Sequence, residues 1–304
     1  MSELARKLKA SIGRVLFGKE DAVELCVTAL IAGGHLLIED QPGVGKTLLA
    51  RAMARALDLP FQRVQCTSDL LPADLLGSQV YHPSTGELHF REGPVFTSIL
   101  LADELNRTPP RTQSALLQCM SEGQVTIDRR TFALPRPFFV IATQNPSTAA
   151  GTYPLPENQL DRFLMRIEIG YPTPEHERMA VEQEDGHRQA SAIAPVATSL
   201  DLEQDARAVD RVRFSPELTE YVVEIAAETR RHGDVRTGVS TRGAQALHRA
   251  CRARAVVRGR DYVVPDDLRA LIEPVWAHRM AVRGGRGAAA AVLREILAEK
   301  GLPE

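Results

Sequence analysis

Short apolar runs alternate with amphipathic stretches over the first part of the chain. The runs have the length of buried strands, and between them apolar residues recur at the three- and four-residue spacing of helices. The predicted strands span residues 36–39, 61–66, 99–104, 138–143 and 165–169, and the predicted helices span 48–57, 112–122 and 155–163, with two more inside 3–32. This alternation predicts an α/β fold in which helices cover both faces of a mostly parallel sheet.

Two further segments alternate polar and apolar residues around turns, which predicts β-hairpins. They span about residues 78–92, around the turn Pro83-Ser84-Thr85-Gly86, and about residues 124–134.

The pattern changes after Pro174, where the strand-like runs stop. Residues 185–210 are polar and irregular, as in a linker. Further helices are predicted at residues 216–232, 241–258, 265–279 and 288–297. We therefore expect a core over residues 1–173, with the two hairpins as insertions, and a linker with an all-helical domain over residues 174–304.

A loop rich in Gly and Pro joins the first predicted strand to a helix. Gly43 and Gly45 carry no Cβ, so they can adopt φ > 0 and let the backbone approach an anion. The first N–H groups of the following helix and its dipole favour negative charge there. Lys46 would reach the outer phosphates of a nucleotide, and Thr47 would offer its hydroxyl to Mg²⁺. Asp40 stands where the first glycine of a strict phosphate loop belongs; the alternative is an ordinary turn.

Three polar residues follow two other apolar runs. Asp103 and Glu104 end one run, and Asn145 follows another. Because the carboxyl ends of parallel strands share one edge of a sheet, we expect these side chains near the glycine-rich loop. Asp103 can hold Mg²⁺ beside Thr47, and Glu104 can deprotonate a water that attacks the terminal phosphate. Asn145 can bind that phosphate or water, or it simply forms a turn before Pro146.

Two arginines and a glycine each have two interpretations on local grounds. Arg162 follows Asp161 at the end of a short predicted helix, and it can pair with Asp161 or project into a neighbouring subunit. Arg242 opens a predicted helix, where the dipole disfavours a cation by about 0.3–1 kcal/mol, so it can serve an anion or simply lie in solvent. Gly18 ends an apolar turn that is either helix packing or a backbone platform beside adenine.

Composition places the chain among globular proteins. Of its 304 residues, 44% are apolar and 25% are charged, and the net charge of −2 gives no whole-protein argument for nucleic acid or an acidic membrane. The four cysteines lack metal-ligand spacing, so we expect them to be reduced and buried, or incidental. The chain opens without an apolar signal core, and no run approaches the length of a membrane span, so we expect a soluble cytoplasmic protein.

The ordered motifs resemble those of AAA+ ATPases, and more narrowly those of the MoxR family. The resemblance rests on residues 39–47 (Walker A), 100–107 (Walker B), 142–146 (sensor 1), 155–163 and 240–242 (sensor 2). It implies an αβα sandwich with a P-loop, a parallel five-stranded sheet and a C-terminal helical lid, with nucleotide held between core and lid. It also implies ATP, Mg²⁺ and a homo-oligomeric ring, usually a hexamer, in which the next subunit completes each site.

The same resemblance implies the roles of single residues. Glu104 would be the catalytic base and Asn145 would be sensor 1. Arg162 would be an arginine finger that acts in trans, and Arg242 would be sensor 2 of the lid. Mg²⁺ would be held by Thr47 and Asp103. The nucleotide would be bound by Gly18, Asp40, Pro42, Gly43, Val44, Gly45, Lys46, Thr47 and Leu48.

Three functions would share these residues. MoxR-like proteins typically work with von Willebrand factor A domain proteins, which implies a chaperone or remodelling factor that assembles or activates protein partners. A nucleic-acid motor or loader is the alternative suggested by the many arginines at 230–260, although stacking aromatics are absent there. A chelatase-like metal-insertion subunit is the third. We favour the first, and expect neither a membrane nor nucleic acid as a partner.

Overall fold

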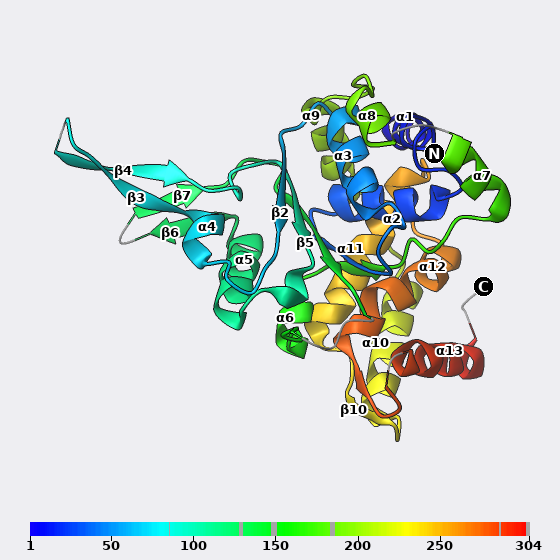
Figure 1. Ribbon diagram of the computed structural model, residues 1–304. Coiled ribbons are helices and arrows are strands. Elements are labelled where there is room, and N and C mark those ends of the chain that lie inside the picture. Colours follow the sequence, from blue (N-terminus) through cyan, green and yellow to red (C-terminus); the bar gives the residue numbers. More distant parts are fainter. Residues whose placement is uncertain (85, 128–129, 147–150, 183–185, 286, 302–304) are drawn as a thin grey trace.

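The computed structural model describes residues 1–84, 86–127, 130–146, 151–182, 186–285 and 287–301 (Figure 1). Thr85 and residues 128–129, at the turns of the two predicted hairpins, lie outside the described residues, as does residue 185 of the predicted linker.

Five parallel strands form the central sheet, in the spatial order β2–β5–β8–β1–β9. Their bounds are β1 Leu36–Glu39, β2 Phe61–Gln65, β5 Ile99–Asp103, β8 Phe139–Gln144 and β9 Met165–Ile167. The register pairs Gln65 with Asp103 and Glu39 with Gln144, so that the carboxyl ends of these strands lie along one edge. The predicted parallel sheet of five strands is confirmed.

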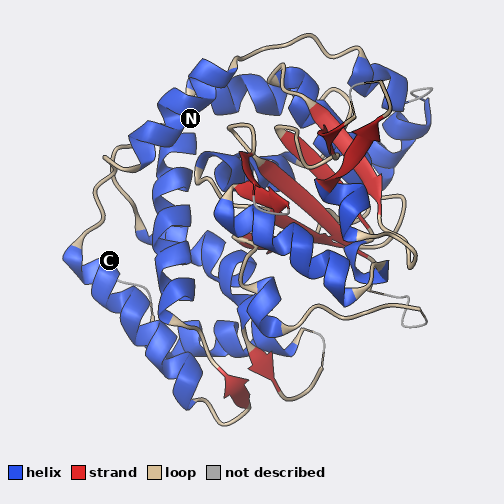
Figure 2. Ribbon diagram, turned by 90° about the vertical axis from the view of Figure 1, so that its left-hand side faces the viewer, coloured by secondary structure: helices blue, strands red, loops and turns tan. Residues whose placement is uncertain are grey.

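Alternate residues of each strand face two separate apolar cores. Leu36 and Ile38 pack in one cluster with α1 (Glu3–Ile12), α2 (Glu20–Ile31) and α3 (Lys46–Ala56). Leu37, between them, packs in a second cluster with α5 (Pro110–Glu122). Alternate residues of a strand point to opposite faces of the sheet, so apolar residues at both sets of positions indicate a sheet that is covered on both faces. Figure 2 shows the strands between these helices. Shorter helical segments are α4 Pro72–Leu76, η1 Leu105–Arg107 and α6 Glu157–Leu160.

Two hairpins project away from the body of the molecule (Figure 1). The first pairs β3 (Gly77–His82) with β4 (Glu87–Glu92), and the second pairs β6 (Gln124–Ile127) with β7 (Arg130–Ala133). Phe90 of the first stacks on Phe132 of the second, with ring centroids 4.2 Å apart. Both predicted hairpins are confirmed, and this aromatic contact joins them.

Helices dominate the chain after β9. They are α7 Pro174–Glu182, α8 Gly186–Ser191, α9 Ser199–Val209, α10 Pro216–Arg231, α11 Thr241–Val257, α12 Pro265–Trp276, η2 Ala277–Arg279 and α13 Ala288–Lys300. A short antiparallel pair, β10 (Val235–Thr237) with β11 (Ala281–Val282), accompanies them.

The predicted irregular linker is wrong, because α8 and α9 lie within it. Thr198 caps α9 by accepting a hydrogen bond from the N–H of Asp201, whose carboxylate accepts in return from the N–H of Thr198. Only Leu202 and Val209 of α9 are buried. A helix with so few buried residues leaves little apolar periodicity in the sequence.

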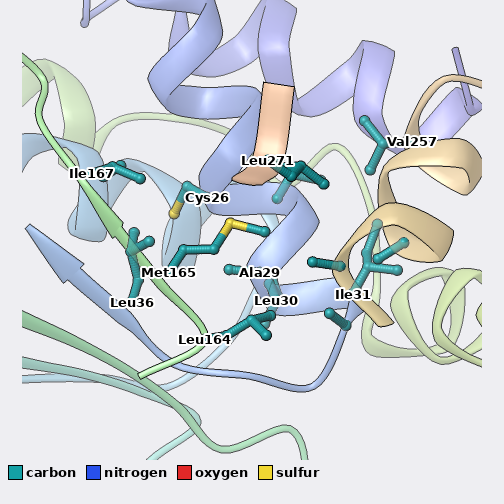
Figure 3. Close-up of a cluster of buried hydrophobic side chains, with 14 of the residues drawn as sticks. Cys26, Ala29, Leu30, Ile31, Leu36, Leu164, Met165, Ile167, Val257 and Leu271 are labelled. Atoms are coloured by element: carbon teal, nitrogen blue, oxygen red, sulfur yellow. The ribbon is translucent and has the colours of Figure 1, made fainter. Parts of the chain in front are cut away.

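Helix α2 lies between the sheet and the C-terminal helices (Figure 3). Nine of its 12 residues are buried. Cys26 and Ala29 of α2 share one apolar cluster with Met165 of β9, Val257 of α11 and Leu271 of α12. A helix that is apolar all round needs partners on every side. The sheet and the C-terminal helices therefore share a single core.

An ionic network reinforces this contact. Glu24 of α2 is only 3% exposed, and its carboxylate lies 3.1 Å from Lys9, 3.4 Å from Arg254 and 2.8 Å from Arg258. Asp267 is fully buried and lies 2.8 Å from both Arg254 and Arg260. Buried carboxylates are stable only when paired in this way.

Other arginines of the 230–260 stretch also have internal partners. Arg249 donates to the carbonyl of Ala32 at 2.5 Å, and Arg252 donates to that of Val212 at 2.9 Å. Arg230 donates to the carbonyl of Val239. Several of the arginines that suggested a nucleic-acid surface thus bind partners within the chain, whereas Arg231 and Arg242 remain 73% and 62% exposed.

Two further expectations concern the whole chain. Within the described ranges, no helix has both the length and the apolar character needed to cross a membrane. All four cysteines are buried, free thiols, as expected.

Replacing Asp267 by Ala is expected to lower the free energy of unfolding by about 3–5 kcal/mol, because breaking a buried pair leaves guanidinium groups without their carboxylate. Denaturant unfolding followed by circular dichroism measures the loss. The matched control is Asp266→Ala, since the Asp266 side chain is 78% exposed and its removal should cost less than about 0.5 kcal/mol. Equal losses in the two variants would contradict the role given to the network.

Candidate functional site

A cavity of about 510 Å³ opens at the carboxyl ends of the strands, and we call it the phosphate-loop cavity. It is lined by Pro42, Gly43, Gly45, Lys46, Thr47, Leu48, Arg63, Gln65, Asp103, Glu104, Asn145 and Gly186. The structure thus brings together the loop, the two carboxylates and the amide that the sequence predicts for one site.

The loop has the backbone that an anion site needs. Gly43 and Gly45 have φ values of 86° and 97°, in the left-handed region that glycine enters at little cost. Helix α3 begins at Lys46, so its first N–H groups and the positive end of its dipole adjoin the cavity. Lys46 Nζ donates to the carbonyl of Asp40 at 2.6 Å. Burial lowers the pKa of Lys46, and the carboxylates of Asp40, Asp103 and Glu104 oppose that shift.

The side chain of Asp40 makes its hydrogen bonds within the chain. It is 7% exposed, and it is not one of the described residues that line the phosphate-loop cavity. Its Oδ2 accepts hydrogen bonds from the N–H groups of Ile169 at 2.7 Å and Gly170 at 2.6 Å, and Oδ1 accepts from that of Gln41 at 2.7 Å. The carboxylate therefore ties the phosphate loop to the segment that follows β9.

Asp103 is oriented by both neighbouring strands. Its Oδ1 accepts from the hydroxyl of Thr143, on β8, at 2.6 Å. Its Oδ2 accepts from Arg63, on β2, at 2.7 Å. Hydrogen bonds to a charged group are shorter and stronger than neutral ones, so this carboxylate is held firmly at the cavity wall.

Glu104 has an unusual backbone for a residue other than glycine. Its φ of 58° and ψ of 46° are left-handed, which costs about 1–2 kcal/mol. Its N–H donates to the Thr143 hydroxyl at 2.9 Å, and its Oε2 accepts from Arg107 at 3.0 Å and from Gln65 at 3.2 Å. Strain of this kind gathers at functional sites. Arg107, which had no predicted role, thus holds Glu104 in place.

Sequence reasoning missed Arg63, Gln65 and Thr143. They lie at or near the carboxyl ends of β2 and β8, beside Asp103 in the sheet. The rule that located Asp103 and Asn145 at strand ends could also have pointed to these three residues.

Val44 and Gly18 lie outside the lining of the phosphate-loop cavity. The Val44 side chain is buried in the core. A Cβ on Gly18 would lie 2.2 Å from the ring of His176, so this ring covers the glycine. Leu16 of the same turn reaches Gly45, where a Cβ would lie 2.7 Å from it. The turn packs against the phosphate loop, and a contact between Gly18 and adenine stays a prediction.

Arg162 and Arg242 line a second cavity, of about 320 Å³. Its wall includes residues 32–35, which precede β1, whereas the phosphate loop follows β1. The two cavities therefore lie at opposite ends of a strand about 13 Å long. Among the described residues, neither arginine lines the phosphate-loop cavity. Arg242 of the lid therefore lies away from the phosphate loop of its own chain, and its role at a nucleotide stays a prediction.

The second cavity carries a surplus of positive charge. Arg279 is paired with Asp161 at 2.7 Å, and Arg249 with Asp210 at 3.4 Å. Arg242 is 3.6 Å from Asp161, and Arg162 donates to the carbonyl of Leu117 at 2.6 Å and not to Asp161. Four guanidinium groups thus share two carboxylates, a surplus that suits an anion.

The buried imidazole of His35 adds no charge to this cavity. It accepts from the N–H of Val140 at Nδ1, and Nε2 faces the carbonyl of Met120. Burial lowers its pKa to about 4, so it is neutral near pH 7.

The residues of the phosphate-loop cavity fit ATP and Mg²⁺. Backbone N–H groups and Lys46 are phosphate ligands, and the Thr47 hydroxyl and Asp103 carboxylate are the oxygen ligands that Mg²⁺ prefers. The volume is within the range of ligand pockets, roughly 300–1,000 Å³.

Comparison with known proteins decides the family. Residues 35–165 match a family model described as "ATPase family associated with various cellular activities (AAA)", and residues 227–296 match "AAA lid domain". Chaperone MoxR1 of Mycobacterium tuberculosis is 41% identical over 281 residues, which cover 89% of this chain and 74% of MoxR1. The chain belongs to the MoxR family of AAA+ ATPases.

Two more relatives extend the likeness over nearly the whole MoxR-family chain. Uncharacterized protein YeaC of Bacillus subtilis is 44% identical over 304 residues, which cover 99% of this chain and 95% of YeaC. A protein from Cytophaga hutchinsonii, known from a crystal structure, is 34% identical in sequence and matches the fold with a TM-score of 0.87. The match covers 99% of this chain and 96% of the Cytophaga chain. These likenesses confirm an AAA core followed by a lid.

Asp40→Ala should destabilise this MoxR-family chain by about 2–4 kcal/mol, because three N–H groups at the base of the loop lose a charged acceptor. Urea unfolding measures the change. Asp210→Ala is the control, since its side chain is 70% exposed and its loss should cost less than about 0.5 kcal/mol. If stability is unchanged and ATP affinity falls instead, Asp40 is a nucleotide ligand after all.

Proposed function

We propose that this chain binds and hydrolyses ATP with Mg²⁺, and that it acts as a chaperone or remodelling factor in the assembly or activation of partner proteins. One observation carries the hydrolysis: Lys46, Asp103 and Glu104 line the same cavity. A phosphate ligand, a metal ligand and a carboxylate that can act as a base, together in one pocket, are the parts of a phosphoanhydride hydrolase.

Each residue has a task in this reaction. Lys46 and the loop N–H groups bind the phosphates, and Thr47 and Asp103 would hold Mg²⁺, which neutralises phosphate charge when bound. Glu104 accepts a proton from a water whose oxygen bonds to the terminal phosphorus. The bond from that phosphorus to the bridging oxygen breaks, which leaves ADP and phosphate. Asn145 hydrogen-bonds the terminal phosphate or the attacking water.

The second cavity supports action between subunits. Arg162 and Arg242 form an anion-binding surface remote from the phosphate loop of their own chain. In a head-to-tail ring, each subunit presents such a surface to the loop of its neighbour. We therefore infer a homo-oligomeric ring, a hexamer by family resemblance, in which Arg162 is the arginine finger and Arg242 acts beside it. Cations placed there stabilise charge that develops during phosphoryl transfer.

Two observations favour a protein client over nucleic acid. Tyr81 and Leu88 are a cross-strand pair on the first hairpin and are 59% and 62% exposed, so the hairpin offers apolar surface to a protein. Four of the arginines at 230–260, namely Arg249, Arg252, Arg254 and Arg258, bind partners within the chain, which leaves fewer of them for the basic stripe that DNA requires.

Clients with a von Willebrand factor A domain are the partners we propose, and the related MoxR1 is itself named a chaperone. The buried free thiols suit the reducing cytoplasm, where we place this activity. A chelatase-like role would use the same catalytic residues and differ in its partner.

Glu104→Gln should retain ATP binding and lower kcat by about 10²–10⁴-fold, because the general base is lost. Phosphate release and binding of a fluorescent ATP analogue measure the two quantities. Lys46→Ala is the comparison variant, and it should lose ATP affinity. Undiminished turnover would remove Glu104 from the role of base.

The same variant tests the client. Affinity capture on ATP-loaded Glu104→Gln, but not on Lys46→Ala, should enrich a protein with a von Willebrand factor A domain. Enrichment of nucleic acid, or of a macrocycle-metallating enzyme, would favour the alternatives.

Mixed rings test action in trans. Arg162→Ala subunits keep their own phosphate loop, and Glu104→Gln subunits keep their finger, so about a quarter of the interfaces in an equal mixture pair two intact halves. ATPase activity should rise above that of either variant alone. A mixture of wild-type and Glu104→Gln subunits is the control that tests whether rings exchange subunits. If exchange occurs without recovery, each site is self-contained.

A further inference from the structure

Arg279, at the end of η2, lines the second cavity and binds the segment that carries Arg162. Its side chain is 4% exposed. Nε donates to Oδ1 of Asp161 at 2.7 Å, and Nη2 donates to the carbonyls of Phe163 at 2.7 Å and Asp161 at 3.4 Å. Nη1 donates to the carbonyls of Leu164 at 3.1 Å and Val275.

These acceptors surround Arg162 on both sides in the sequence. Three backbone carbonyls and one carboxylate of residues 161–164 accept from a single planar guanidinium. A buried cation is stable only when its N–H groups have acceptors. The Arg279 guanidinium and residues 161–164 therefore hold each other in place. The direction in which Arg162 leaves the backbone is therefore set by Arg279.

The same lid end also constrains Arg242. Oδ2 of Asp161, the carboxylate held by Arg279, lies 3.6 Å from Nε of Arg242. Trp276 donates from its indole N–H to the carbonyl of Gly243 at 2.9 Å, next to Arg242. Burial and the adjacent Arg279 lower the pKa of His278, so this neighbour stays neutral. The surplus charge of the cavity thus remains on Arg162 and Arg242.

We propose that Arg279 is a positioning residue for catalysis in the neighbouring subunit: it fixes Arg162 and Arg242 in the geometry that meets the neighbour's nucleotide. This inference rests on the proposed action in trans. A residue of the lid, with no place in the phosphate-loop cavity of its own chain, then controls turnover at the next site in the ring.

Arg279→Lys tests this role, because lysine keeps the positive charge but lacks the planar guanidinium that donates to several acceptors at once. In rings of this variant, kcat should fall on the order of 10²-fold, as misplacement of a catalytic group by about 1 Å does. The Kd of a fluorescent ATP analogue should change less than about twofold, since the variant's own phosphate loop is intact. A rise in Kd that matches the fall in kcat would contradict the proposal.

Complementation separates positioning from a general loss of structure. Arg279→Lys subunits mixed with Glu104→Gln subunits should recover ATPase activity, because the former have an intact loop and the latter an intact finger. Mixed with Arg162→Ala subunits they should not recover, since both lack the same half of the site. Recovery in the second mixture would overturn the link between Arg279 and Arg162.

The matched control is Arg260→Lys. Arg260 is another lid arginine with a mostly buried side chain, 22% exposed, and it binds both oxygens of Asp267. This variant should lose stability but keep kcat within about twofold. Should Arg279→Lys fail to fold, Asp161→Asn removes the shared carboxylate charge and should give the same complementation pattern.

The outcomes distinguish this inference from the proposed function. If Glu104→Gln rescues Arg162→Ala but not Arg279→Lys, the trans site stands and the positioning role of Arg279 is wrong. If rings exchange subunits and neither variant is rescued, the trans site itself is wrong, and the role of Arg279 falls with it.

Discussion

Helix α2 is buried on all sides, and its burial constrains the rest of the molecule. One side packs on β9 and the other on α11 and α12, so the lid belongs to the apolar core of the sheet. Moving the lid away would expose this helix and separate Glu24, which is 3% exposed, from Arg254 and Arg258. The lid is therefore held where its Arg242 faces the amino end of β1, away from the phosphate loop. A site that needs these cations must obtain them from another copy of the chain.

The direction of the sheet gives the subunit two chemically different ends. Glycines, the start of α3 and Lys46 gather at the carboxyl end of β1 and suit phosphates. Arg162 and Arg242 gather at the amino end with a surplus of charge. A nucleotide bound at the first end has the negative charge that suits the second end, so the two different surfaces can meet in a heterologous interface. Ring closure then depends on the angle between subunits, and the resemblance to AAA+ proteins supplies the expectation of six.

The sequence predicts much of the site because its chemistry is local. Gly43, Gly45 and Lys46 act through a turn, and Asp103 and Asn145 through their positions at strand ends. Contacts between residues that are far apart in the sequence could not be predicted. Arg258 meets Glu24, 234 residues away, so a stretch that resembles a basic surface is internal. Asp40 looks like a loop residue until Ile169 is placed beside it by the β1–β9 pairing. Arg279 likewise acquires a role only through the contacts of residues 161–164.

Strand β9 connects the two ends of the subunit. Directly after it, Ile169 and Gly170 donate to Asp40, whose carbonyl accepts from Lys46 in the phosphate loop. Directly before it, Phe163 and Leu164 accept from Arg279. Between these two sets of contacts, residues 165–167 pair with β1 in the sheet. A phosphate that draws Lys46 toward itself competes with the carbonyl of Asp40, and only this short, hydrogen-bonded strand separates that residue from the segment that presents Arg162. Strand β9 is thus a direct physical connection between the phosphate loop and the segment that carries Arg162, the residue that we propose as the finger.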